Sequence, residues 1–91
     1  MNQKELSNQI SEEFNLSKAE SERILKYILN EISQELLSDQ RVCFHRFGTF
    51  HRFLRAPKKY RNIKTGKIET SPAYFDIKFN PSKSLLKKLN K

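Results

Sequence analysis

The chain has 91 residues, of which 31% are charged and 36% hydrophobic, and a formal net charge of +8 at pH 7. A chain this short forms one small domain that is near the lower limit for independent stability, so additional burial against a partner chain is expected. No stretch approaches the ~20 apolar residues of a membrane-spanning helix, which excludes a protein of that kind.

The charges are distributed unevenly along the chain. Residues 1–40 contain four Lys/Arg and eight Asp/Glu, a net charge of −4, whereas residues 41–91 contain fourteen and two, a net charge of +12. A positive field of this strength is typical of proteins that bind nucleic acid or an anionic membrane surface. The basic half lacks the pattern of an amphipathic helix, which favours nucleic acid over a membrane.

The first forty residues predict two helices that pack antiparallel to each other. Asn2 is a suitable N-cap, and Leu6, Ile10 and Phe14 then recur at every fourth position as one apolar stripe. Asn15 readily adopts the left-handed conformation and is expected to end the first helix.

The second predicted helix begins at the capping box formed by residues 17–20 and ends at residues 38–40. Its apolar face is broader than the short first helix can cover, so we expect it to contact another chain as well. The residues that we predict at the dimer interface, on this helix and on the strands that follow, are Ile28, Leu29, Ile32, Leu36, Phe44, Phe47, Phe50 and Phe79.

From residue 41 onwards, the apolar pattern becomes strand-like. Residues 41–47 and 49–54 predict the two strands of a hairpin with Gly48 at its turn, and alternation over residues 75–79 predicts a third, half-buried strand. A short helix is expected to start at residues 80–82. The strand phenylalanines could stack on bases, but their spacing favours a core, with Phe53 and Tyr60 as the expected exceptions.

Residues 55–74, between the second and third strands, have the composition of a nucleic-acid-binding arm. They carry six Lys/Arg and a single acid, Glu69, and too few large apolar residues to form a core. A turn signal at Thr65-Gly66 lies near the middle, with Pro57 and Pro72 at similar distances on either side. We interpret this segment as a two-stranded ribbon with exposed edges that grips a polyanion.

The single cysteine, Cys43, excludes an intrachain disulfide and favours a reducing cytoplasm. Cys43 lies close in sequence to His45 and His51, but a structural zinc site needs four ligands and no fourth candidate is present. No paired acid, oriented serine or Gly-rich phosphate loop accompanies the histidines. We therefore predict no metal site, no cofactor and no enzymatic activity.

Several motifs resemble those of the bacterial HU/integration host factor family, in order and over essentially the whole chain. They are Phe-Gly-Thr-Phe at residues 47–50, Arg-Ala-Pro at 55–57, Arg-Asn at 61–62 with Thr-Gly at 65–66, Pro-Ala at 72–73, and Phe-x-Pro-x-Lys-x-Leu at 79–85. The resemblance implies an α+β fold and an intertwined dimer. Its helical body carries two β-arms that enter the DNA minor groove and bend the duplex, as architectural proteins of the HU and IHF type do.

This resemblance assigns a role to each part of a single domain spanning residues 1–91. The expected parts are a helical dimerisation part (1–40), a sheet (41–54 and 75–79), a DNA-binding arm (55–74) and a C-terminal helix (80–91). The predicted DNA-binding residues are Arg46, Arg52, Arg55, Lys58, Lys59, Arg61, Asn62, Ile63, Lys64, Lys67, Ser82 and Lys83.

The sequence departs from the family pattern at the tip of the arm. Ile63 occupies the position of the family proline that inserts between base pairs; it is apolar and of comparable bulk but lacks the fixed φ of proline. We predict that Ile63 intercalates with a weaker or less localised kink. Tyr60 stands where small residues are usual, Asn80 replaces a usual lysine, and Arg46 replaces a usual glycine, adding a charge near the base of the arm.

The expected function is that of a histone-like protein of the bacterial nucleoid that binds and bends duplex DNA largely independently of sequence. Bent, nicked or gapped DNA should be preferred, because unstacking costs a few kcal/mol per base step. A homodimer is expected, with a heterodimer with a paralogue as the alternative. Two other functions remain open: a sequence-specific bending subunit of the integration-host-factor type, towards which Arg-Ala-Pro at 55–57 leans, and an RNA-binding or ribosome-associated protein.

Overall fold

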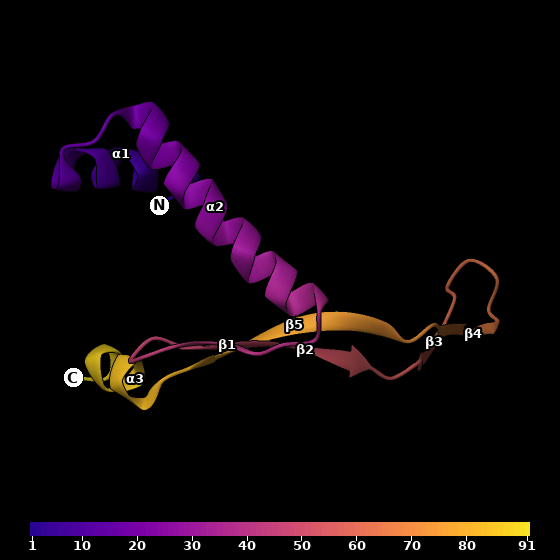
Figure 1. The fold of residues 1–91 in the computed structure, drawn as a ribbon. Helices are drawn as coiled ribbons and strands as arrows, with labels where there is room; N and C mark the ends of the chain where they lie inside the picture. Colours follow the sequence, from indigo (N-terminus) through magenta and orange to yellow (C-terminus); the bar gives the residue numbers. More distant parts are fainter. The chain divides into compact units, whose positions relative to one another are not determined.

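The computed structural model describes all 91 residues and has the predicted α+β composition (Figure 1). The chain divides into two compact units, Met1–Ser38 and Asp39–Lys91. The first unit contains only helices, and the second contains every strand and the last helix. In chain order the elements are α1 (Gln3–Phe14), α2 (Lys18–Leu37), β1 (Val42–Phe44), β2 (Gly48–Arg55), β3 (Lys58–Arg61), β4 (Ile68–Ser71), β5 (Tyr74–Pro81) and α3 (Lys83–Leu89).

The ends of α1 and α2 confirm the caps predicted from the sequence. The Oδ1 of Asn2 accepts a hydrogen bond from the backbone N–H of Glu5 at 2.8 Å, and Asn15 ends α1 in the left-handed conformation with φ 55°. At the start of α2, the Oγ of Ser17 accepts from the N–H of Glu20 at 3.1 Å. These side chains satisfy N–H groups that the first turn of a helix leaves without partners.

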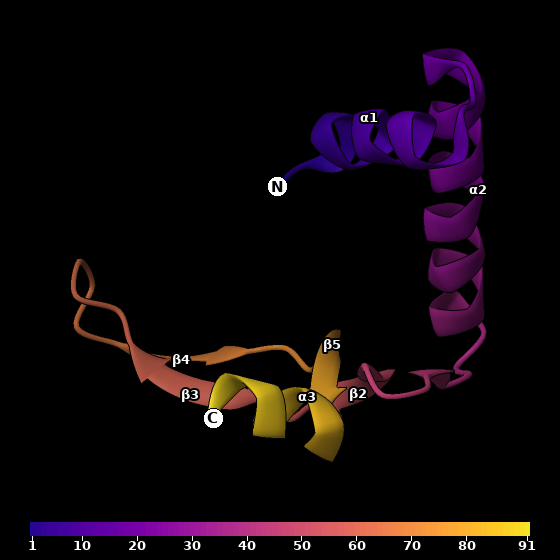
Figure 2. The same cartoon turned by 90° about the vertical axis from the view of Figure 1, so that its left-hand side faces the viewer.

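The most buried side chains of α1 and α2 include three serines. Ser7 and Ser11 of α1 and Ser21 of α2 are buried. Each hydroxyl donates to a carbonyl one turn earlier in its own helix, at 2.9–3.0 Å, so none of the three is left unsatisfied. Side chains this small let the helices approach closely, while Phe14 remains 67% exposed. Figures 1 and 2 show the two helices crossing steeply, so the predicted antiparallel arrangement is wrong.

Most of the apolar surface of the helical unit is uncovered in the single chain. Leu25 and Leu36 are the only buried large hydrophobic side chains of the whole protein, whereas Ile28 and Leu29 on α2 are 44% and 43% exposed. An apolar surface of this extent is typical of an interaction site. It is consistent with the predicted dimer.

The second unit contains a three-stranded antiparallel sheet and a separate ribbon. The sheet order is β1-β2-β5, and β2 pairs with β5 over eight positions, from Gly48 opposite Pro81 to Arg55 opposite Tyr74. Strands β3 and β4 form the two-stranded ribbon, which continues from the end of the β2–β5 pair as a protruding arm (Figures 1 and 2). The predicted sheet and arm are therefore both present.

The turn between β1 and β2 lies at residues 45–47 and not at Gly48, which corrects the predicted hairpin. Arg46 has φ 62°, and the N–H of Phe47 donates to the carbonyl of Phe44 at 3.0 Å. Strand β1 is consequently shorter than predicted. Gly48 is the first residue of β2, where a Cβ atom would lie 2.5 Å from a ring carbon of Phe79. Close packing, and not a turn, requires glycine at this position.

The two faces of the sheet differ in chemistry. The register places Phe50 and Phe79 opposite each other, and the ring centroids of Phe47, Phe50 and Phe79 lie 4.7 to 6.5 Å apart. Phe53 lies on the other face, with His51, in agreement with the prediction that Phe53 is not one of the core phenylalanines. The apolar face is formed by Val42, Phe44, Phe50, Leu54, Phe75, Ile77 and Phe79.

The C-terminal helix has its N-cap within residues 80–82, as predicted, and its first helical residue is Lys83. Pro81 is the last residue of β5 and not part of the first helical turn. Ser82 is the N-cap of α3, and its Oγ accepts a hydrogen bond from the N–H of Leu85 at 3.1 Å. The N–H of Ser82 donates to the carbonyl of Phe47 at 2.9 Å, which ties the start of α3 to the β1–β2 turn.

Candidate nucleic-acid interface

The tip of the arm is a tight turn held by its own hydrogen bonds. The N–H of Asn62 donates to the carbonyl of Lys67 at 2.9 Å, and the N–H of Gly66 donates to the carbonyl of Asn62 at 2.7 Å. Gly66 has φ 71°, a conformation that glycine adopts without strain. The Oδ1 of Asn62 also accepts from the N–H of Lys64 at 2.9 Å. The turn leaves Ile63 98% exposed, with no apolar neighbour to cover it.

The cations of the ribbon are exposed and make no ion pair within the chain. Because side chains alternate along a strand, Lys59 and Arg61 lie on one face of the ribbon and Lys58 on the other. Positive charge therefore surrounds the arm and is available to phosphates. The five residues are Lys58, Lys59, Arg61, Lys64 and Lys67.

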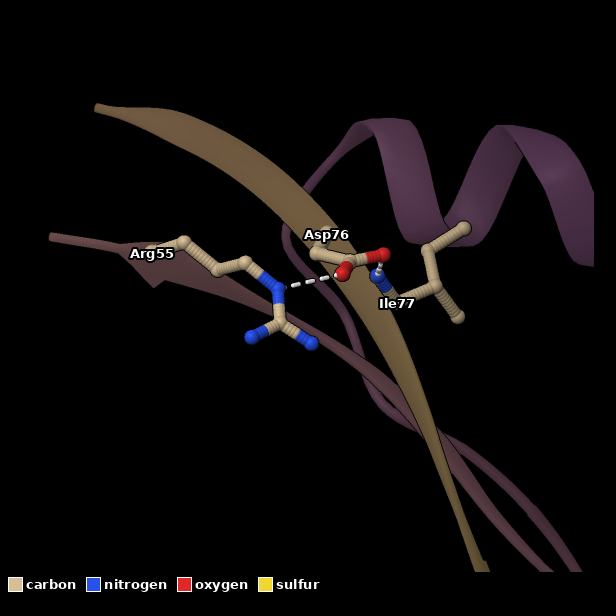
Figure 3. A network of polar contacts seen from close by, with 3 residues as sticks. All are labelled: Arg55, Asp76 and Ile77. Atoms are coloured by element: carbon tan, nitrogen blue, oxygen red, sulfur yellow. Dashed lines mark hydrogen bonds and ion pairs between the residues drawn. The ribbon is translucent and has the colours of Figure 1, made fainter. Parts of the chain in front are cut away.

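Two more of the predicted arginines, both on β2, are held in ion pairs. The Nε of Arg55 lies 2.6 Å from the Oδ2 of Asp76 (Figure 3), and the Arg55 guanidinium lies 5.1 Å from the centroid of the Phe53 ring. The Nε of Arg52 lies 3.1 Å from the Oδ1 of Asp39. These pairs orient both arginines, and no local sequence pattern indicated them because the partners lie 21 and 13 residues away.

The Arg55–Asp76 pair changes the acidity of both groups. The hydrogen bond from Arg55 lowers the pKa of Asp76, and a second hydrogen bond, from the N–H of Ile77 to Oδ1 at 2.7 Å, lowers it further (Figure 3). Asp76 in turn raises the pKa of Arg55, which stays charged.

We expect the Asp76 carboxyl to titrate below the ordinary range of aspartate. Because the pKa of Asp76 is lowered in the folded state, its pairing with Arg55 stabilises the fold at pH values above the pKa of this aspartate in the unfolded chain. This stabilisation is lost as the pH falls through the lowered pKa. The side-chain ¹³C shift of Asp76 measured by NMR against pH checks this. Arg55→Gln should return the midpoint towards the ordinary value; an unchanged midpoint in that variant would contradict the pairing.

A second hydrogen-bonded group lies along the ribbon and was not foreseen. Tyr60 and Glu69 are directly opposite each other in the β3–β4 register. The Tyr60 hydroxyl donates to Oε2 of Glu69 at 2.8 Å, and the Nδ2 of Asn62 donates to Oε1 at 3.1 Å. The bond to Glu69, with a smaller effect of burial, raises the pKa of Tyr60. The pair could have been predicted from the sequence, because positions 60 and 69 are equally distant from the centre of the turn that joins β3 and β4.

The remaining predicted DNA-binding residues lie at the opposite end of the sheet from the arm. Arg46 is in the β1–β2 turn, beside the start of α3, where Ser82 and the exposed Lys83 are located. The expectation that Arg46 adds a charge near the base of the arm is wrong, because the whole of β2 separates the two. The predicted residues thus form two groups, one on the arm and one around the start of α3.

No other group of side chains offers a competing site. Cys43 is exposed, and the Nδ1 of His51 lies 3.4 Å from the Nδ2 of Asn80. The structure has no cluster of three or more His, Cys, Asp or Glu that could hold a metal ion. None of its helices combines the length and apolar character needed to span a membrane.

Comparison with known proteins agrees with this geometry. A family model described as bacterial DNA-binding protein matches residues 1–90. The chain belongs to this family. It is 34% identical over 91 residues to integration host factor subunit beta of Saccharophagus degradans, covering 99% of this chain and 93% of that protein. Over 85 residues it is 36% identical to DNA-binding protein HU of Xylella fastidiosa, covering 93% and 90%.

The fold is shared with a member of the family whose structure includes DNA. Anabaena HU, in a cocrystal with DNA, matches this chain with a TM-score of 0.88 and 27% identity, over 98% of this chain and 97% of that one. The resemblance to the HU/integration host factor family is thereby confirmed. The similarity extends to both HU proteins and integration host factor subunits.

Proposed function

We propose that this protein is an architectural DNA-binding protein that binds duplex DNA through the minor groove and bends it. The observation that carries the proposal is the arm: a ribbon of exposed, unpaired cations that ends in an apolar side chain with 98% exposure, Ile63. Apolar wedges inserted from the minor groove are how such proteins kink DNA. The DNA in the cocrystal of Anabaena HU supports the same function for this chain.

The affinity would come mainly from phosphate contacts. The proposed DNA contacts are the twelve residues predicted from the sequence: Ile63 is the wedge, flanked by Arg61 and Asn62, and the others supply the polar contacts. Arg52 and Arg55 are oriented by their carboxylate partners. A dimer carries twice the +8 of one chain, so release of counterions should dominate binding. We expect the binding affinity to depend little on DNA sequence, because the minor groove distinguishes mainly A·T from G·C pairs.

The functional particle would be a dimer in which both units of the chain act as one domain. The exposed apolar residues of α2 and of the sheet supply the surface that a second chain would cover. Ile28, Leu29, Phe44 and Phe47 are exposed and Phe79 is partly so, while Ile32 and Phe50 are half-buried and Leu36 is buried within the chain. We propose a homodimer of the bacterial nucleoid with no catalytic role, and a heterodimer as the alternative.

A sequence-specific bending subunit is the second candidate. The similarity to integration host factor subunit beta over 99% of the chain favours it. Footprinting on a long duplex separates the two functions, because a specific factor protects one site while a general one protects none in particular. Competition with structured RNA at fixed salt tests the RNA-binding alternative.

The proposed function predicts how binding depends on salt and on breaks in the DNA. We expect the affinity for a short duplex to fall roughly a thousandfold between about 50 and 200 mM salt if six or more phosphates are contacted. The same duplex with a nick or gap should bind more tightly, since its unstacking cost is already reduced. Fluorescence anisotropy across a salt series measures both quantities.

Ile63→Ala is the matched variant for this experiment, because it removes the wedge and leaves the charge unchanged. It should reduce bending of the intact duplex, measured by energy transfer between labelled ends, while affinity for the gapped duplex changes little. Equal losses on both substrates would show that Ile63 does not wedge. A steep salt dependence of the affinity without preference for gapped DNA would indicate that the protein coats DNA through charge alone and does not bend it.

A further inference from the structure

The arm contains a carboxylate in the middle of a cationic ribbon, and its environment explains what it does there. Glu69 is the single acid among residues 55–74 and lies on β4. It makes no ion pair with any of the neighbouring lysines or arginines. Both of its oxygens instead accept hydrogen bonds from neutral donors on the opposite strand, Tyr60 and Asn62.

The three side chains share one face of the ribbon. Tyr60 and Asn62 are two residues apart on the β3 side, and Glu69 is opposite Tyr60 in the register, so all three point to the same side. Arg61 and Lys59 point to the other side. One face of the ribbon therefore carries the hydrogen-bonded group together with Lys58, and the other carries Lys59 and Arg61.

Asn62 connects this group to the turn that presents Ile63. Its Nδ2 donates to Glu69, and its Oδ1 accepts from the backbone N–H of Lys64. Ile63 is thus held between an anchored side chain and an anchored N–H, although its own side chain touches nothing that would orient it. If Glu69 were unable to accept from Asn62, the amide would be free to rotate and the turn would lose one of its bonds to the strand.

We propose that Glu69 is a positioning residue that, through Tyr60 and Asn62, fixes the tip of the arm so that Ile63 enters the base stack in a defined orientation. The inference rests on the proposed wedge function. Isoleucine does not restrict its own backbone as proline would. Rigidity of the tip must therefore come from the surrounding hydrogen bonds.

A purely electrostatic role for Glu69 predicts the opposite behaviour. On that account Glu69→Leu raises the charge of the arm by one and would tighten binding to every duplex to the same extent. Positioning predicts a selective effect, because only the insertion of Ile63 into intact, stacked DNA depends on the orientation of the tip. The ratio of affinities for gapped and intact duplex separates these roles.

The test compares Glu69→Leu and Tyr60→Phe with Thr70→Val. Leucine is close to glutamate in size and offers no acceptor to Tyr60 or Asn62, whereas a glutamine amide could still bond to both. Thr70 is next to Glu69 on β4 but on the other face, so its variant deletes a hydroxyl, as Tyr60→Phe does, without touching the group. Each protein is titrated against the intact and the gapped duplex, and bending of the intact duplex is measured by energy transfer. Order parameters of the residue 63 and 64 amides are measured by ¹⁵N relaxation in the free proteins.

We expect Glu69→Leu to increase the preference for gapped over intact DNA about fivefold and Tyr60→Phe about twofold, as expected for losing two and one exposed hydrogen bonds. Both should lower the bend of the intact duplex. In free Glu69→Leu, the order parameters at the tip should fall from rigid values of about 0.85 towards 0.6. Thr70→Val should behave as the unaltered protein does.

The possible failures are distinguishable. If the unaltered protein bends DNA and Glu69→Leu keeps both its ratio of affinities and its tip order parameters, the positioning role is overturned and the wedge function stands. If Glu69→Leu binds both duplexes more tightly by the same factor, Glu69 acts by charge alone. If the unaltered protein neither bends DNA nor prefers the gapped duplex, the proposed function itself fails, and this inference fails with it.

Discussion

Gly48→Ala is expected to destabilise the protein by about 2–3 kcal/mol, in the upper part of the range for overpacking. An added Cβ would lie 2.5 Å from a ring carbon of Phe79 and 2.6 Å from the backbone carbonyl oxygen of Asn80. The ring could move only by disturbing its contacts with Phe47 and Phe50, and the carbonyl belongs to β5, the strand that pairs with Gly48. Relief therefore requires a shift of the β2–β5 pair.

Urea denaturation at a fixed protein concentration measures this loss, with Gly66→Ala as the matched control. Gly66 has φ 71°, and a Cβ added there would meet nothing within 4 Å, so its alanine variant has a conformational cost of roughly 1 kcal/mol and no clash. That cost falls on the exposed tip of the arm and should leave the unfolding midpoint of the body nearly unchanged. A Gly48→Ala protein as stable as Gly66→Ala would contradict the packing argument.

Ile28→Lys is expected to weaken dimerisation about a hundredfold or more, because a charged group would be buried without a partner. In the single chain Ile28 is 44% exposed, so the substitution should barely affect the helix itself. The loss should appear only where a second chain covers α2. Sedimentation equilibrium measures the dissociation constant, and circular dichroism on dilution reports whether α2 loses helicity as the dimer separates.

Gln34→Lys provides the control for this variant. Gln34 is exposed and lies on the side of α2 opposite Ile28, Leu29 and Ile32, given 100° per residue along a helix. It introduces the same charge without placing it in the predicted interface, and its dissociation constant should match that of the unaltered protein. If Ile28→Lys also dimerises with unaltered affinity, the apolar face of α2 has another purpose.

Local signals in the sequence predicted most elements of this protein. Asn2, Asn15 and Ser17 cap helices because a short polar side chain, or a residue tolerant of the left-handed conformation, suits a helix end wherever it occurs. Alternation in residues 75–79 identified β5, and the charge and turn chemistry of residues 55–74 identified the arm. Family motifs spread over the chain added the function, which no local pattern specifies.

Where local signals failed, the deciding contact was with a residue distant in sequence. Glycine and a left-handed turn usually coincide, yet here Arg46 takes the turn and Gly48 makes room for Phe79 across the sheet. On α1 the most buried residues are Ser7 and Ser11, which the sequence did not single out because serine is usually a surface residue.

The sequence alone determined what this protein carries: a basic ribbon, an apolar tip and two faces rich in aliphatic and aromatic side chains. Only the tertiary structure decided which charged side chains are free to contact DNA and which are bound in ion pairs or hydrogen bonds within the chain. Strand register brings Glu69 opposite Tyr60 and places Arg55 within 2.6 Å of Asp76, so one carboxylate orders the tip and another orders the base of the arm. A pairing of this kind depends on register, and register is set by the strands as a whole because one residue of slip moves every side chain to the other face.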